Sequence, residues 1–199
     1  MIAKFLFGLM IAVVMGLLAA PAVAQTIESV FTALDLKKCR HMPGKAEEDY
    51  GDWRCTGFDG IAVYVSTGDQ RTYVSYGRNA KKEPAAKQTL ASFNGEGDKI
   101  EWRGEREANG KFKPFATIMR WSTTVSTDDK PVRGQVLVVT RLGSGGVCHV
   151  GYVDGKANTD ANVLALKIAD EQARKFSCGA DKIIVLGNKG PGFSGSYDD

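Results

Sequence analysis

Histidine is scarce in this chain of 199 residues, which has only His41 and His149. A hydrolase that activates a serine or cysteine needs a base beside its nucleophile, and histidine most often supplies it. Catalysis of this kind is therefore restricted to two positions. Phosphate-binding glycine loops, a dinucleotide fingerprint and the ligand spacing of zinc sites are also missing. The sequence thus predicts no cofactor, no metal site and no identifiable catalytic residue.

A strong excess of charge is missing as well. The formal net charge is +3, and basic residues such as Lys81 and Lys82 are scattered among acidic ones. Nucleic-acid-binding proteins usually concentrate positive charge in a patch or stripe. We therefore expect an ordinary solvated surface without a basic groove, and no nucleic-acid partner.

The longest apolar run lies at the N-terminus, over residues 5–19, and is shorter than the roughly 20 residues of a membrane-spanning helix. Lys4 precedes it, and Ala22, Val23 and Ala24 follow as a small-x-small cleavage site. This order of features is typical of a secretory signal peptide. It predicts a signal peptide over residues 1–24, a mature chain that begins at Gln25, a periplasmic location and no stable membrane anchor after cleavage.

The four cysteines all follow the predicted cleavage site. An even number of cysteines in an oxidising compartment favours disulfides. Three pairings are possible, and proximity in the sequence favours Cys39 with Cys55 and Cys148 with Cys178.

The mature chain has no internal linker or repeat, and its patterns predict a single α+β domain over residues 25–186, followed by a flexible tail over 187–199. A mostly antiparallel sheet of about six strands should carry one long C-terminal helix, stapled by two disulfides. The element patterns place a short amphipathic helix over 27–36 and a hairpin over 60–66 and 71–76. Further strands are expected over 99–103, 115–123, 134–142, 147–153 and 182–186, and the long helix from about 160 to 176.

Regular alternation in the strand at 147–153 would place Cys148, Val150 and Tyr152 on one face and His149 on the other. His149 could then be a ligand, a base or a plain strand residue. If Cys148 is bridged, it has no thiolate for His149 to activate. An envelope hydrolase using His149 or His41 would need a carboxylate that only the fold brings near.

Aromatic residues are the remaining candidates for a contact surface, because Tyr and Trp are favoured at interface hot spots. Trp53 borders the first expected disulfide, and Tyr73 and Tyr76 lie on the second strand of the expected hairpin. Three positions separate these tyrosines, so they face opposite sides of a regular strand. We therefore take Trp53, Tyr73 and Tyr76 as candidate contact residues.

Two segments carry a resemblance: 52–55 (Asp-Trp-Arg-Cys) with Gly57 and Gly60, and 147–154 (Val-Cys-His-Val-Gly-Tyr-Val-Asp) with the helix pattern that leads to Cys178. They resemble a group of uncharacterised exported proteins of Gram-negative, alphaproteobacterial type. The resemblance implies a periplasmic address and two disulfides, and it brings no activity and no site residue.

Together these features favour an exported, non-enzymatic protein that binds another macromolecule. The expected partner is an envelope protein, or a hydrolase that this chain would inhibit. The alternative is the envelope hydrolase described above.

Overall fold

The computed structural model describes residues 26–42, 50–128 and 130–196. The predicted signal peptide, the end of the predicted tail at 197–199 and residues 43–49 lie outside these ranges. Strands dominate, and they form two sheets. The large sheet contains β1 (Thr26–Ala33), β6 (Phe93–Gly95), β7 (Lys99–Arg106), β8 (Phe112–Val125), β9 (Val132–Arg141), β10 (Cys148–Asp154) and β11 (Ile184–Val185). The small sheet contains β2 (Arg40–Met42), β3 (Gly51–Thr56), β4 (Ala62–Gly68) and β5 (Arg71–Tyr76).

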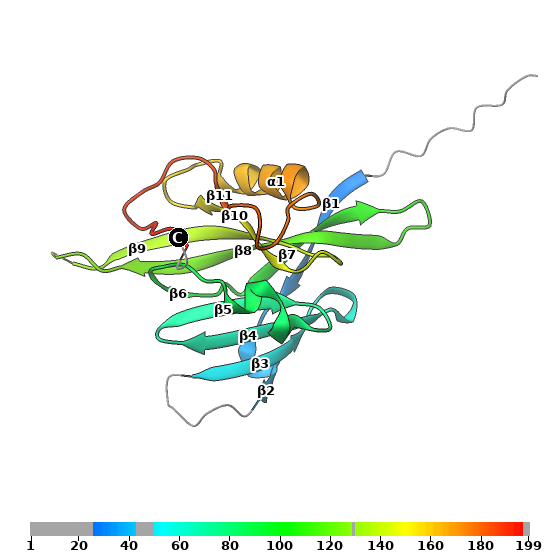
Figure 1. Ribbon diagram of the computed structural model, residues 1–199, viewed down its shortest axis with the longest axis horizontal. Helices are drawn as coiled ribbons and strands as arrows, with labels where there is room; N and C mark the ends of the chain where they lie inside the picture. Colours follow the sequence, from blue (N-terminus) through cyan, green and yellow to red (C-terminus); the bar gives the residue numbers. More distant parts are fainter. Residues whose placement is uncertain (1–25, 43–49, 129, 197–199) are drawn as a thin grey trace, which may run out of the picture.

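Three layers result, with the α-helix α1 (Ala161–Gln172) on one face of the large sheet and the small sheet on the other (Figure 1). The large sheet has the order β1-β7-β8-β9-β10-β11, and β6 pairs with β8. All its pairs are antiparallel except β10 with β11. Four short 3-10 helices lie in the connections: η1 (Leu36–Lys38), η2 (Phe58–Gly60), η3 (Ala80–Lys82) and η4 (Pro84–Lys87).

The large sheet is buried on both faces because each outer layer contributes its own core. Between the sheets, Trp102, Trp121 and Tyr152 pack against residues of the small sheet such as Val65 and Tyr76. On the opposite face the helix buries a stripe at helical spacing against the sheet: Ala161, Ala165, Ile168, Ala169 and Ala173. The helix is therefore amphipathic, and it buries its apolar stripe against the large sheet.

The α+β class and the mostly antiparallel sheet are confirmed, but two details of the expectation are wrong. The strands are more numerous than about six, because the chain forms one sheet of seven strands and another of four. The helix is short, with 12 residues, because regular helix ends at Gln172 instead of continuing to Phe176.

Residues 26–33 form an edge strand, where a short helix was expected. β1 pairs with β7 at eight consecutive positions, from Thr26 opposite Arg106 to Ala33 opposite Lys99. Its β-branched residues Ile27 and Val30 suit a pleated strand. Tertiary pairing with a distant segment decided the conformation, which local periodicity cannot show.

A bulge in β10 changes which face each residue occupies. The register with β9 shifts between His149 and Gly151, so Val150 is the extra residue. Cys148 and Val150 therefore both contact the helix layer, whereas Tyr152 lies in the core between the sheets. The expected alternation was wrong for Tyr152 because it assumed a regular strand.

Both disulfides form as predicted, Cys39–Cys55 and Cys148–Cys178. The first closes a loop with a sequence separation of 16, and the second one of 30. The expected hairpin is also present as β4 and β5. Asp69 and Gln70 turn it with positive φ angles of 50° and 57°, as a two-residue hairpin turn of the favoured type requires.

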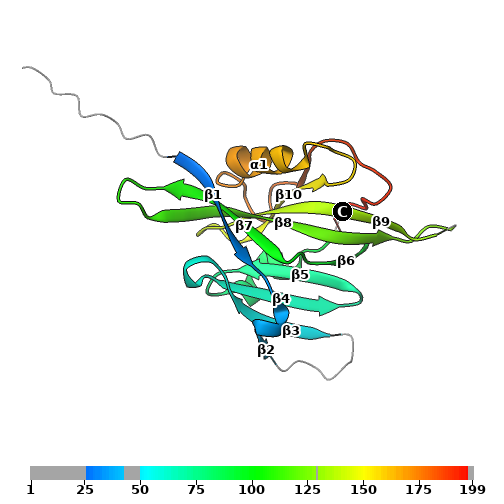
Figure 2. The same ribbon diagram turned by 180° about the vertical axis from the view of Figure 1, so that it is seen from behind.

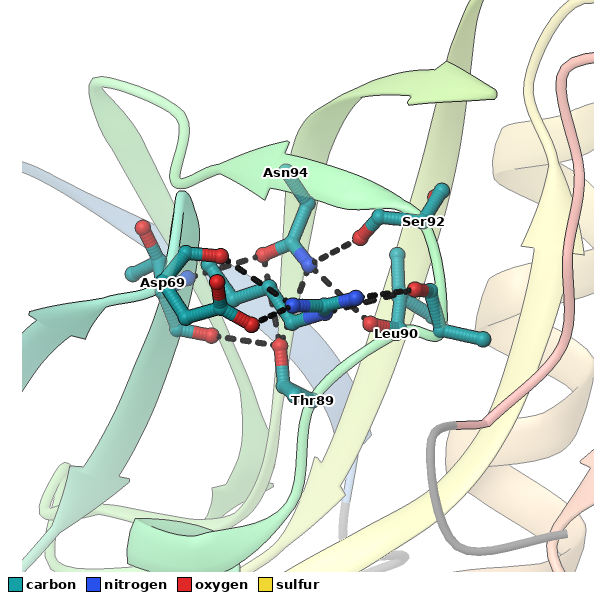
Figure 3. Close-up of polar contacts among 8 residues, drawn as sticks. Asp69, Thr89, Leu90, Ser92 and Asn94 are labelled. Atoms are coloured by element: carbon teal, nitrogen blue, oxygen red, sulfur yellow. Dashed lines mark hydrogen bonds and ion pairs between the residues drawn. The ribbon is translucent and has the colours of Figure 1, made fainter. Parts of the chain in front are cut away.

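Asn94 joins the small sheet to the segment that leads into the large sheet (Figure 3). Its Oδ1 accepts a hydrogen bond from the Thr72 amide at 3.0 Å, in β5. Its Nδ2 donates to the carbonyls of Leu90 at 3.2 Å and Ser92 at 2.8 Å. Thr89 completes the cluster by donating from Oγ1 to the Thr72 carbonyl at 2.8 Å. One amide side chain thus satisfies backbone groups of two layers.

Residues 187–196, expected as part of a flexible tail, are instead tied to the domain by hydrogen bonds. The Gly190 amide donates to buried Asp154, and Thr123 Oγ1 donates to the Gly192 carbonyl at 2.7 Å. Ser194 Oγ accepts from the Ser92 amide, and Ser196 is buried beside Leu90. Glycine-rich composition alone does not reveal such anchoring contacts.

Replacing Asn94 with alanine should lower the free energy of unfolding by about 2–3 kcal/mol, because several part-buried backbone groups lose their partner together. Denaturant unfolding of the oxidised protein measures this change. Asn109→Ala is the matched control, since Asn109 is exposed and accepts one local bond from the Lys111 amide; a loss within about 0.5 kcal/mol is expected there. Equal losses in the two variants would contradict the bridging role of Asn94.

Candidate functional site

His149 is fully buried and packs against Trp121 and Tyr152 of the core between the sheets. Its ring lies at right angles to those of Trp121 and Tyr152, with ring centroids 5.7 and 5.6 Å away. Nδ1 lies 2.8 Å from the Tyr152 hydroxyl, and no described carboxylate contacts the ring. Desolvation by burial lowers the pKa of His149 to about 3. A neutral imidazole without access to solvent or to an acid offers no general base.

His41 lies on the exposed edge strand β2, and its ring centroid is 5.4 Å from that of Trp53. Among the described residues it contacts no carboxylate and no nucleophile. The geometry therefore provides no support for the hydrolase alternative at either histidine.

The three aromatic residues expected at a contact surface do not share one. Tyr76 is buried in the core, where its ring meets that of Trp102 edge-on at 5.6 Å. Trp53 is half-buried and packs against the same core. Tyr73 is half-buried on the other face of the small sheet, opposite Ser66. The small sheet thus separates Tyr73 from the other two.

A different surface is formed by β1, which is the edge of the large sheet (Figure 2). It pairs with β7 on one side, and no described strand pairs with its other side. An edge strand presents a row of unpaired backbone N–H and C=O groups. Phe31, near the end of β1, is 55% exposed. The ammonium of Lys99 lies over the Phe31 ring, 5.9 Å from the ring centroid.

Beside this edge lies an open groove of about 680 Å³ on the helix side of the large sheet. Ile118 and Leu137 form an apolar floor, and Phe31 and Leu166 stand on opposite sides. The rim contains charges of both signs. The full lining is Phe31, Gly97, Asp98, Lys99, Glu101, Ile118, Arg120, Ser122, Gln135, Leu137, Asn162 and Leu166.

Arginine side chains fix the two walls of the groove relative to each other. Arg103 of β7 forms a two-pronged ion pair with Asp170 of α1, with N···O distances of 2.7 and 2.8 Å. It also donates to Ser29 of β1 at 3.2 Å, so one guanidinium connects β1, β7 and α1. The hydrogen bond to Asp170 raises the pKa of Arg103 and keeps it charged. Arg120 similarly donates to Asn162, near the start of the helix, at 2.8 Å. The walls are therefore preorganised.

No residue of this surface could be recognised from the sequence pattern. Phe31 was assigned to a helix, and the remaining groove residues come from segments far apart in the chain. The β-branched residues of 26–33 were the signal that could have indicated a strand.

No family model, curated protein or solved structure matches the chain. Within the described ranges, no three His, Cys, Asp or Glu side chains are grouped so that they could hold a metal ion. None of the described helices has the length and apolarity needed to cross a membrane.

Acid should destabilise the protein through His149. Its pKa is about 3 in the folded chain and about 6.5 when unfolded, so below pH 6.5 the unfolded state binds the proton more tightly. The stability that the protein gains by keeping His149 neutral is complete above about pH 6.5, and it is lost as the pH decreases toward 3. The expected loss from His149 is about 2 kcal/mol between pH 6.5 and 4.5.

Urea unfolding at several pH values tests this. His149→Phe and His149→Gln should each remove that part of the pH dependence, whatever their stability at neutral pH. An unchanged dependence in both variants would show that His149 does not titrate between the folded and unfolded states.

Proposed function

We propose that this protein is an exported, non-catalytic binding module that takes an extended segment of another envelope protein along β1. The observation that carries the proposal is the unpaired edge of β1 beside an open groove, with Phe31 exposed where they meet. An extended peptide that adds to a sheet edge gains main-chain hydrogen bonds, and neighbouring pockets select its side chains.

The composition of β1 supports this use of the edge. Proteins usually protect long edge strands with proline, lysine, bulges or a covering element. β1 has eight residues, contains neither proline nor lysine, and is regularly paired throughout. Its one charged residue, Glu28, is engaged in an ion pair with Arg106. The described sequence and pairing of β1 thus contain no proline, lysine or bulge that would prevent strand addition.

The groove supports selectivity for a polypeptide. Its apolar floor suits one or two apolar side chains, and Asp98, Glu101, Lys99 and Arg120 provide charges of both signs around it. A segment with alternating apolar and charged residues would match this surface. A hydrolase inhibited through such a segment is one form that the envelope partner could take.

The periplasmic address rests on separate support. The two disulfides suit an oxidising compartment, the N-terminal sequence has the order of a signal peptide, and β1 starts two residues after the predicted cleavage site. The resemblance to exported proteins of Gram-negative bacteria agrees with this address. Intact-mass measurement of the periplasmic form should give a chain that begins at Gln25. A form that retains residues 1–24 and fractionates with the membrane would contradict it.

Phe31→Lys should weaken partner binding at least about tenfold, because it places a charge at the junction of edge and groove. Tyr50→Lys is the matched control, since Tyr50 is equally exposed at 55% but belongs to the small-sheet side. A photo-crosslinking residue at position 31 in cells identifies the contacted segment by mass spectrometry. The same residue at position 50 provides the comparison.

The decisive measurement uses that segment as a synthetic peptide with the purified protein. The peptide should slow hydrogen exchange of the β1 amides. It should also bind the Tyr50→Lys variant with the same affinity as the parent protein. Equal crosslinking from both positions, or protection of other strands without β1, would overturn the proposal.

A further inference from the structure

A second concave site lies on the outer face of the small sheet, away from the groove. β2, β3 and β4 supply its floor, and the chain that follows β5 forms the opposing wall. Its volume is about 200 Å³. The lining residues are Met42, Arg54, Ala62, Tyr64, Arg78, Asn79, Ala80, Lys81 and Lys82.

Four cationic side chains line this small pocket, and none of its lining residues in the described ranges, 26–42, 50–128 and 130–196, is acidic. Arg54, Arg78 and Lys82 are exposed and form no ion pair with a described residue. Arg54 comes from β3, and Arg78 and Lys82 come from the segment after β5. Bringing like charges into one concavity is unfavourable unless an anion compensates them. The fold thus gathers four basic residues from segments that are separated in the sequence.

Asp52, a described carboxylate on the same face of the small sheet, is already bound to other partners. Its Oδ1 accepts hydrogen bonds from Tyr64 at 2.9 Å and Ser66 at 2.8 Å, and its Oδ2 forms an ion pair with Lys81 at 2.8 Å. Partial burial favours its neutral form, but the hydrogen bonds from Lys81, Ser66 and Tyr64 lower the pKa of Asp52 overall. Asp52 therefore fixes Lys81 in place, and no carboxylate of the described residues forms an ion pair with Arg54 or Arg78.

Apart from Asn79, the remaining lining is mostly apolar. Tyr64 is buried to 7% exposure and Ala80 to 5%, and Ala62 and Met42 complete this side. The ammonium of Lys81 lies 5.7 Å from the centre of the Tyr64 ring. A ligand for this pocket thus combines an anionic group with a small apolar part.

We propose that this pocket binds a phosphomonoester through Arg54 and Arg78, with Lys81 and Lys82 at its rim and the apolar part of the ligand against Tyr64 and Met42. The forked guanidinium of arginine matches phosphate oxygens in a two-pronged geometry, and a phosphomonoester carries close to two negative charges at neutral pH. The ester could come from a soluble metabolite or from a lipid headgroup, since both present the same group.

Calorimetric titration of the mature, oxidised protein with phenyl phosphate tests the site at fixed ionic strength. Saturable binding is expected, tighter for phenyl phosphate than for inorganic phosphate, and weaker by about tenfold from pH 7.5 to pH 5 as the dianion is protonated. Vesicles of phosphatidylcholine with and without phosphatidic acid distinguish the source. If the protein binds only the vesicles that contain phosphatidic acid, the ligand is a lipid headgroup. If it binds phenyl phosphate but neither kind of vesicle, the ligand is a soluble ester.

Arg54→Ala and Arg78→Ala should each weaken phenyl phosphate binding by about tenfold or more. Arg133→Ala, an exposed arginine on β9, is the matched control and should bind as the parent does. Unchanged melting temperatures establish that the variants fold. Three results would overturn the proposal: no saturable binding, equal loss in Arg133→Ala, or equal binding of inorganic phosphate and phenyl phosphate. Because none of these residues belongs to β1 or the groove, this outcome is independent of the strand-addition test.

Discussion

The packing of the two sheets against each other depends on Trp102, which is fully buried where they meet. Its Nε1 donates to Thr32 of β1 at 2.8 Å, and its ring meets that of Tyr76 of the small sheet edge-on. Gly57 approaches so closely that a Cβ there would lie 2.4 Å from the indole. Because strand residues alternate between faces, Thr32 turned toward Trp102 leaves Phe31 on the opposite face, beside the groove. The same core contact therefore joins the layers and places the exposed aromatic residue of the edge.

The groove exists because the helix layer is too small for the sheet that it covers. A helix of 12 residues is about 18 Å long, whereas β8, with 14 residues, extends over about 46 Å. Ile118 and Leu137 belong to the buried helix-side core, and they also lie at the margin of the opening that the short helix leaves. The small sheet has a smaller opening on its own outer face, where the short segment after β5 lies over Tyr64 but leaves Arg54 and Arg78 exposed.

Features determined by nearby residues could be predicted from the sequence, and features determined by distant pairing could not. The hairpin of β4 and β5, the buried stripe of α1 and the two disulfides depend on local pattern or on proximity in the chain. The strand at 26–33 depends on β7, and the inward position of Tyr152 depends on a bulge that only its partner strand defines. Both candidate sites combine residues from several such segments. Neither the convergence of Arg54 with Arg78 nor that of Phe31 with Leu166 has a signature in composition or spacing.

Each of the two disulfides constrains chain segments that contribute to one of the two candidate sites. Cys39–Cys55 joins the chain just before β2 to β3, the strands that supply Met42 and Arg54 to the cationic pocket. Cys148–Cys178 joins β10 to the chain after α1, and α1 supplies Leu166 and Asn162 to the groove. By the chain-entropy estimate, loops of these lengths contribute about 3–4 kcal/mol each, which is a large share of the stability of an ordinary domain. In a reducing compartment the segments that form these surfaces would lose that constraint. The disulfides beside both sites therefore favour an oxidising compartment.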